Sequence, residues 1–162
     1  MLVLSDKARI SRLADIEDSV RGSTITIEAG VVIDSFVKIK PAGGVGDVYI
    51  AEGSTINSGT VLYSGNGIRI GRGALIGANC TLAPVNHAYR DRARTIVEQR
   101  FAESKGGIVL EDDVWVGSGC VILDGAVLRK GCVVGALSLV RGELEEYGIF
   151  GGNPLRRLGT RG

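Results

Sequence analysis

The stretch from Leu110 to Val134, LEDDVWVGSGCVILDGAVLRKGCVV, places an aliphatic residue at every sixth position. Four places after each of these stands a small or β-branched residue, and a Gly or Asp often precedes that second position. Gly and Asp tolerate the positive φ angles that tight turns require. Because a six-residue period does not keep one helical face apolar, the pattern predicts short strands joined by tight turns.

The same period runs through most of the chain. Its aliphatic positions are Ile10, Ile16, Ile27, Ile33, Ile39, Ile50, Ile56, Leu62, Ile70, Ile76, Leu82, Leu110, Val116, Ile122, Leu128, Val134 and Val140. The small positions that follow include Ala14, Val20, Val31, Val37, Ser54, Thr60, Ala74, Val114, Ala126 and Ser138. Since one repeat cannot bury its apolar side chains alone, we expect stacked coils that share a continuous interior.

The composition limits the class of protein. The 162 residues include 44% hydrophobic residues, and no apolar run reaches the length of a membrane span, so we expect one domain over residues 1–162. A formal net charge of +1 argues against broad electrostatic binding of nucleic acid. No signal peptide is evident, which leads us to expect a cytoplasmic protein.

The three cysteines, Cys80, Cys120 and Cys132, all occupy the small position of the repeat. We therefore interpret them as buried core residues. They form no CxxC or Cys/His cluster, so no metal site is expected.

The repeat breaks at His87, the only histidine of the chain. We expect repeats over about 10–87 and 108–142, with a polar excursion loop over about 88–107 between them. Residues 143–162 then form a C-terminal cap. In this cap, Asn153 as an N-cap, Pro154 in the first turn and a following Gly159 predict a short helix.

Three motifs carry a family resemblance: APVNH at 83–87, IVLEDDVWVGS at 108–118 and GGNP at 151–154. With them, the chain resembles the hexapeptide-repeat acyltransferases, and within these the maltose, galactoside and polysaccharide sugar O-acetyltransferases. The resemblance implies an all-β, left-handed parallel β-helix. It also implies a homotrimer with acetyl-CoA, the acyl donor, in a groove between neighbouring subunits and no required metal.

The resemblance also implies catalytic and acceptor-binding roles. His87 matches the catalytic base, which would take a proton from a sugar hydroxyl that attacks the thioester of acetyl-CoA. Asn86 and Tyr89 would border the acceptor. Free imidazole, with a pKa of about 6.5, is neutral yet basic at cellular pH. A lone histidine is more often structural, but the break in the repeat favours catalysis.

Other residues match the donor side of the family's site. Trp115 points outward in the repeat phase, and it is interpreted either as a subunit contact or as a wall of the acetyl-pantetheine and acceptor sites. The remaining candidates for contact with the coenzyme are Ser118, Gly135, Ala136, Ser138, Arg141, Arg156 and Arg157. The arginines suit phosphate oxygens, although an exposed arginine is usually only solvated. Leu137 stands where the family usually has Gly.

Several functions remain open at this stage. The predicted one is acetyl-CoA-dependent O-acetylation of a sugar hydroxyl, in a saccharide or a polysaccharide or lipopolysaccharide precursor. The alternatives are N-acetylation of a nucleotide-linked amino sugar and a non-catalytic assembly protein on the same scaffold. A zinc carbonic anhydrase of this shape needs several histidine ligands, which a chain with one histidine cannot supply.

Overall fold

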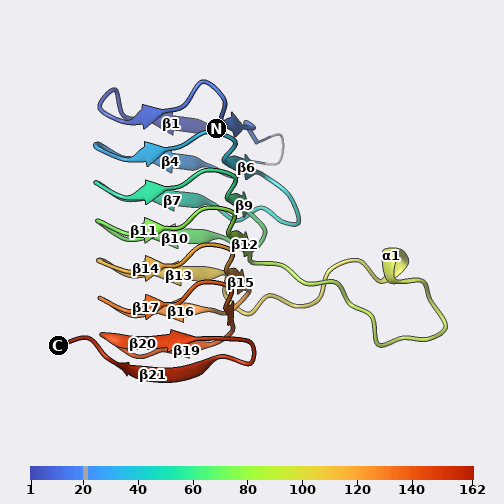
Figure 1. Ribbon diagram of the computed structural model, residues 1–162. Coiled ribbons are helices and arrows are strands. Elements are labelled where there is room, and N and C mark those ends of the chain that lie inside the picture. Colours follow the sequence, from blue (N-terminus) through green and yellow to red (C-terminus); the bar gives the residue numbers. More distant parts are fainter. Residues whose placement is uncertain (20–21) are drawn as a thin grey trace.

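The computed structural model describes residues 1–19 and 22–162, and it forms a left-handed parallel β-helix (Figure 1). Each coil contributes one strand to each of three parallel sheets, which are the sides of a prism. The two termini lie at opposite ends of the stack (Figure 1). The predicted fold class is confirmed.

The strands follow one another around the prism in a fixed order. The first sheet contains β1 (Leu2–Leu4), β4 (Ile25–Ile27), β7 (Val48–Ile50), β10 (Ile68–Ile70), β13 (Ile108–Leu110), β16 (Val127–Leu128) and β19 (Glu143–Leu144). The second contains β2 (Arg9–Ile10), β5 (Val32–Ile33), β8 (Thr55–Ile56), β11 (Leu75–Ile76), β14 (Trp115–Val116), β17 (Val133–Val134), β20 (Gly148–Gly151) and β21 (Arg156–Thr160). The third contains β3 (Asp15–Ile16), β6 (Lys38–Lys40), β9 (Val61–Tyr63), β12 (Thr81–Ala83), β15 (Val121–Leu123) and β18 (Leu139–Val140).

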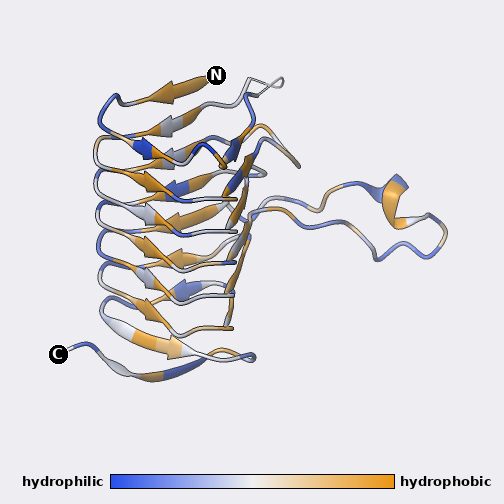
Figure 2. Ribbon diagram, turned by 45° about the horizontal axis from the view of Figure 1, so that its top comes forward, coloured by the Kyte–Doolittle hydropathy of each residue, from blue (hydrophilic) through white to orange (hydrophobic). Residues whose placement is uncertain are grey.

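The interior is the row of aliphatic positions that the repeat predicts. From Ile27 to Val140, every one of them is at most 1% exposed. Ile10 and Ile16 are only partly buried because they lie in the first coil, which has a neighbour on one side only. The predicted small position Val20 lies outside the described residues. Apolar strands therefore recur coil after coil along the stack (Figure 2).

The register of the stack continues across the excursion. In the first sheet, Ile70 of β10 pairs with Ile50 of the coil before it and with Leu110 of β13 after the break. The parallel pairing of identical inward positions means that the loop is inserted without shifting the face on which any side chain lies.

Three corners connect the sheets. The second corner, between the second and third sheets, brings the backbones of successive coils close together. A Cβ on Gly117 would lie 2.5 Å from the backbone nitrogen of Ala136 in the next coil, so only glycine fits there. At the same corner Leu137 adopts a φ of 58°, a region that glycine occupies at lower cost. The third corner, between the third and first sheets, holds the excursion.

The predicted C-terminal helix is wrong. Residues 156–160 instead form β21, which pairs antiparallel with β20 and covers the end of the second sheet. A φ of 96° at Gly152 makes the turn between the two strands. The N-cap pattern of Asn153 is a local preference, whereas the last coil exposes a row of unpaired backbone groups that a returning strand satisfies. Edge pairing therefore overrides the helical signal.

The one helical segment of the described residues lies in the excursion. Helix α1 (Ile96–Gln99) begins at Thr95, whose side chain accepts from the backbone of Glu98 while Glu98 accepts from that of Thr95. This capping box stabilises a single turn of helix. The excursion extends sideways, far from the prism (Figure 1).

Candidate active site

The two limbs of the excursion meet where they leave the prism. His87 and Phe101 form an isolated antiparallel bridge. The backbone nitrogen of Ala88 donates to the carbonyl of Arg100 at 3.0 Å, and that of Ala102 donates to the carbonyl of Asn86 at 2.8 Å. The outgoing limb that carries His87 is thus held by the returning limb.

This pairing also orients the imidazole of His87. Its Nδ1 lies 3.2 Å from the carbonyl oxygen of Arg100, and its ring packs on Phe101 with the centroids 5.0 Å apart. Since a carbonyl oxygen only accepts, Nδ1 carries the proton in the neutral ring, and the lone pair lies on Nε2. The arrangement leaves Nε2 available as a proton acceptor.

A cavity of about 640 Å³ opens beside His87 at the third corner. Of the predicted site residues, His87, Asn86, Tyr89 and Arg141 line it together. The other lining residues are Arg90, Ile96, Ala102, Glu103, Lys105, Leu123 and Asp124. The structure therefore brings the expected base and the expected acceptor neighbours into one cavity.

The donor-side residues lie elsewhere in the same chain. Trp115 is on β14 in the second sheet, and Ser118, Gly135 and Ala136 are at the second corner. A three-residue strand of the third sheet, roughly 10 Å long, separates this corner from the third one. A single chain therefore does not bring these residues to His87.

Trp115 is outward-facing, as its repeat phase predicts. It is 52% exposed, and its neighbours along the second sheet are Leu75, 43% exposed, and the half-buried Val133. The three form an apolar outer row. An exposed indole over such a row favours a covering molecule on this face.

Ser138 is turned into the prism. Its hydroxyl donates to the carbonyl of Gly135 at 2.6 Å and accepts from the backbone nitrogen of Gly152 at 2.9 Å, and the residue is 2% exposed. The Ser138 side chain thus stabilises the second corner and the start of the C-terminal turn. Because the Ser138 hydroxyl is occupied within the chain, the predicted contact of this residue with the coenzyme would be made by its backbone, and it stays a prediction.

The three arginines expected near phosphates are dispersed. Arg141 lies at the third corner, in the cavity of His87, instead of beside the second corner. Arg156 and Arg157 are exposed on β21. Arg157 pairs with Glu145 at 2.9 Å and donates to the hydroxyl of Thr160.

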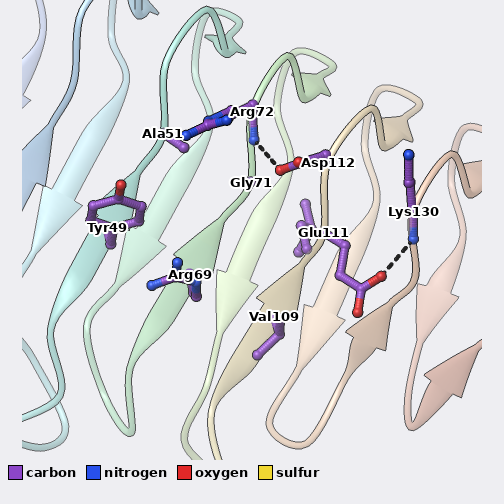
Figure 3. A pocket seen from close by; sticks show the side chains of 10 residues that line it. Tyr49, Ala51, Arg69, Gly71, Arg72, Val109, Glu111, Asp112 and Lys130 are labelled. Carbon is purple, nitrogen blue, oxygen red and sulfur yellow. Dashed lines mark hydrogen bonds between the residues drawn. The ribbon is translucent and has the colours of Figure 1, made fainter.

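A second cavity, of about 350 Å³, lies on the first sheet (Figure 3). Its polar groups largely bind one another: Arg69 lies over the Tyr49 ring at 4.8 Å, and Asp112 accepts from the backbone nitrogen of Arg72 at 2.7 Å. A hydrogen bond from the Arg129 guanidinium, followed by one from the backbone of Lys130, lowers the pKa of the carboxyl group of Glu111, another lining residue. No predicted site residue lies here.

The three cysteines are buried at 1% exposure or less, which confirms their interpretation as core residues. A hydrogen bond with Cys120 and then burial raise the pKa of the Cys80 thiol, and burial raises the pKa of Cys132 to about 11. In the described part of the chain, no group of three or more His, Cys, Asp or Glu residues could hold a metal ion, and no helix is long and apolar enough to cross a membrane.

Known proteins with similar sequences or structures share this repeat architecture. The family described as "Hexapeptide repeat of succinyl-transferase" matches residues 67–86 and 107–136, on both sides of the excursion. Over these residues the chain is similar to the hexapeptide-repeat family. The resemblance to its acyltransferases is confirmed by the relatives and solved structures that the chain matches.

Two curated relatives show how widely this family varies in function. WbbJ of Escherichia coli, named for O-acetyl transfer in lipopolysaccharide biosynthesis, is 26% identical over 83% of this chain and 68% of its own. Gamma carbonic anhydrase 2 of Arabidopsis thaliana mitochondria is 31% identical over 77% of this chain and 48% of its own. This chain spans less than two thirds of the length of most of the curated relatives it matches.

Among solved structures, a single-residue mutant of AntD, an N-acyltransferase from Bacillus cereus, in complex with dTDP and coenzyme A, is similar over nearly the whole chain. The TM-score is 0.81 at 26% identity, and the match covers 99% of this chain and 84% of AntD.

Sequence reasoning missed two groups that shape the cavity. The carbonyl of Arg100 carries no side-chain signal, since any residue supplies one. Asp124 precedes Gly125 at a corner and therefore reads as an ordinary turn residue. One signal could have indicated the contact of Asp124 with the excursion. Asp124 is a carboxylate in a turn, and it lies shortly after the excursion in the sequence.

Proposed function

We propose that this protein is an acetyl-CoA-dependent acetyltransferase that modifies a sugar hydroxyl, with His87 as the general base. The observation that carries the proposal is the hydrogen bond from Nδ1 of His87 to the Arg100 carbonyl. It supports the tautomer that carries its proton on Nδ1, with the Nε2 lone pair beside a cavity large enough for a sugar ring. The family supports acetyl or acyl transfer, since WbbJ and AntD carry the names of such enzymes.

The proposed reaction is direct transfer. Nε2 of His87 accepts the proton of the acceptor hydroxyl, whose oxygen forms a bond to the thioester carbonyl carbon. The carbon–sulfur bond breaks, and the leaving coenzyme thiolate takes up the proton that Nε2 of His87 received, which restores the base. Asn86 and Tyr89, which line the cavity, are placed to contact the acceptor.

We further propose that the working site forms between copies of the chain, as a homotrimer. The donor-side residues Trp115, Ser118 and Ala136 lie on a different corner from His87, so a neighbouring copy has to supply one of the two halves. The exposed apolar row of Leu75 and Trp115 supports a covered face. Sedimentation equilibrium should then report three times the chain mass of 17.0 kDa.

The test of the base compares wild type with His87→Ala, with acetyl-CoA and a panel of sugars. We expect turnover to fall by about 10²- to 10⁴-fold, the usual contribution of a general base. Binding of acetyl-CoA, measured by calorimetry, should stay unchanged because the proposed donor-side residues Trp115 and Ser118 lie on a different part of the chain from His87. Added imidazole should restore part of the lost rate. Equal turnover by the two proteins would refute the role of His87.

A second acceptor class is favoured by one observation. AntD, an N-acyltransferase, has been solved with dTDP-4-amino-4,6-dideoxyglucose and coenzyme A in one of its variants and superposes over 99% of this chain, so a nucleotide-linked amino sugar is the alternative acceptor. The cavity cations Arg90 and Arg141 suit a phosphate-bearing acceptor. Mild alkali distinguishes the products by mass spectrometry, because acetyl esters are cleaved and amides survive.

A further inference from the structure

One carboxylate is buried at the base of the excursion. Asp124 follows β15 at the third corner, lines the cavity of His87 and is only 6% exposed. Aspartate is rarely buried unless hydrogen bonds replace its hydration. Its partners therefore indicate what it does.

Asp124 binds the returning limb of the excursion. One carboxylate oxygen accepts from the backbone nitrogen of Lys105 at 2.8 Å and from the Asn66 amide at 3.1 Å, and the other accepts from the backbone nitrogen of Gly107 at 2.9 Å. The backbone nitrogen of Gly125 donates back to the carbonyl of Gly107 at 2.7 Å. Both oxygens of Asp124 thus accept hydrogen bonds and stabilise the point where the limb rejoins the prism.

The excursion is held by hydrogen bonds and not by burial. None of the residues 86–106 is buried, so packing does not hold the loop. Five residues before Lys105, the same limb supplies the Arg100 carbonyl that accepts from Nδ1 of His87. The limb therefore connects the Asp124 carboxylate to the orientation of the imidazole.

We infer that Asp124 is a positioning residue for His87. By holding the backbone of Lys105 and Gly107, it keeps the returning limb against the outgoing one, so that the Arg100 carbonyl holds Nδ1 in its protonated form. Because its oxygens are occupied by N–H donors, Asp124 does not itself take the substrate proton. Only the catalytic consequence of this inference rests on the proposed function.

The test uses the fact that His87 is the only histidine of the chain. In ¹⁵N-labelled protein, one pair of imidazole nitrogen signals reports its tautomer without any activity measurement. We expect the wild type to be mainly Nδ1-protonated in the neutral form, and Asp124→Ala to show a mixture with the Nε2-protonated form. Trypsin cleavage at Arg90 to Arg100 should accelerate by roughly tenfold or more, because charge-assisted hydrogen bonds that close the loop are lost.

Two further variants make the test specific. Asp124→Asn keeps one acceptor oxygen but turns an amide donor toward an N–H. Its tautomer ratio and its trypsin cleavage rate should therefore lie between those of wild type and Asp124→Ala. If Asp124→Ala does not fold, Asp124→Asn carries the same two measurements. Asp112→Ala is the matched control, since Asp112 also accepts from a backbone nitrogen, that of Arg72, but at the first corner, between the first and second sheets. It should leave tautomer and cleavage rate unchanged.

The turnover measurement separates the two proposals. With Asp124 as a positioning residue, kcat falls in Asp124→Ala while the KM for acetyl-CoA is unchanged. A wild-type tautomer and a wild-type cleavage rate in the folded Asp124 variants would overturn the inference. If the tautomer changes as expected but the wild-type protein acetylates no acceptor, the positioning role stands and the proposed function fails.

Discussion

The coil stack and the excursion at 84–107 are built in opposite ways. In the stack, the aliphatic positions from Ile27 to Val140 are at most 1% exposed, and neighbouring coils pair the same inward positions. In the excursion, no residue from 86 to 106 is buried, and the structure depends on a few hydrogen bonds at its base. A repetitive core tolerates such an insertion because its register is set on both sides of the loop. The candidate chemistry lies on the part with the least packing.

The largest expected contrast is between one core and one loop substitution. Leu82→Ala, at a position with 0% exposure, should lower the free energy of unfolding by about 2–5 kcal/mol because it leaves a cavity. Val97→Ala, at 84% exposure in the excursion, should change it by less than about 0.5 kcal/mol. Urea unfolding followed by circular dichroism measures both. Similar losses for the two variants would show that the excursion shares the core's stability.

A smaller effect is expected at Cys132, which is fully buried. Cys132→Ala should lower the free energy of unfolding by on the order of 1 kcal/mol at neutral pH and leave turnover unchanged. Burial raises the pKa of this thiol from 9.0 to about 11, so the unfolded chain loses the proton at lower pH than the folded one. The stability from this group is therefore present below pH 9 and is lost as pH rises towards 11. Alkaline unfolding of the variant should be less steep; an unchanged profile or lost turnover would contradict the core interpretation.

The smallest effect concerns Leu137, at the second corner. Its side chain is 78% exposed, and its φ of 58° is strained for a residue with a Cβ. Leu137→Gly should raise the free energy of unfolding by up to about 1 kcal/mol, with relief of strain partly offset by the entropy of glycine. Leu137→Ala keeps the Cβ and serves as the control. A destabilised glycine variant would mean that the leucine makes a contact worth more than the strain.

The predictable part of the molecule is the part where local pattern and tertiary environment agree. Spacing alone predicts that Val116 and Cys120 face inward, since every coil repeats the same environment. The C-terminal segment departs from its predicted helix because the N-cap signal at Asn153 is local, whereas β21 forms through pairing with the exposed edge of β20.

The candidate site also has a part that the sequence predicts and a part that depends on tertiary or quaternary structure. The break in the repeat predicts His87, and Tyr89 lies in its cavity as expected, whereas Arg141, expected at the coenzyme phosphates, lies in the same cavity instead. The donor-side residues Trp115 and Ser118, expected in a groove between neighbouring subunits, lie on another part of the same chain from His87. Their convergence stays a prediction that depends on neighbouring copies.

The six-residue period alone determines the coil, its inward side chains and the place where the chain departs from it, because each repeat meets the same neighbours. The tautomer of His87 and the burial of Asp124 were decided only by the tertiary structure. They depend on backbone groups of Arg100, Lys105 and Gly107, which every residue type carries and no sequence pattern marks. Hydrogen bonds between segments distant along the chain set the geometry of the site, whereas hydrophobic periodicity sets the scaffold.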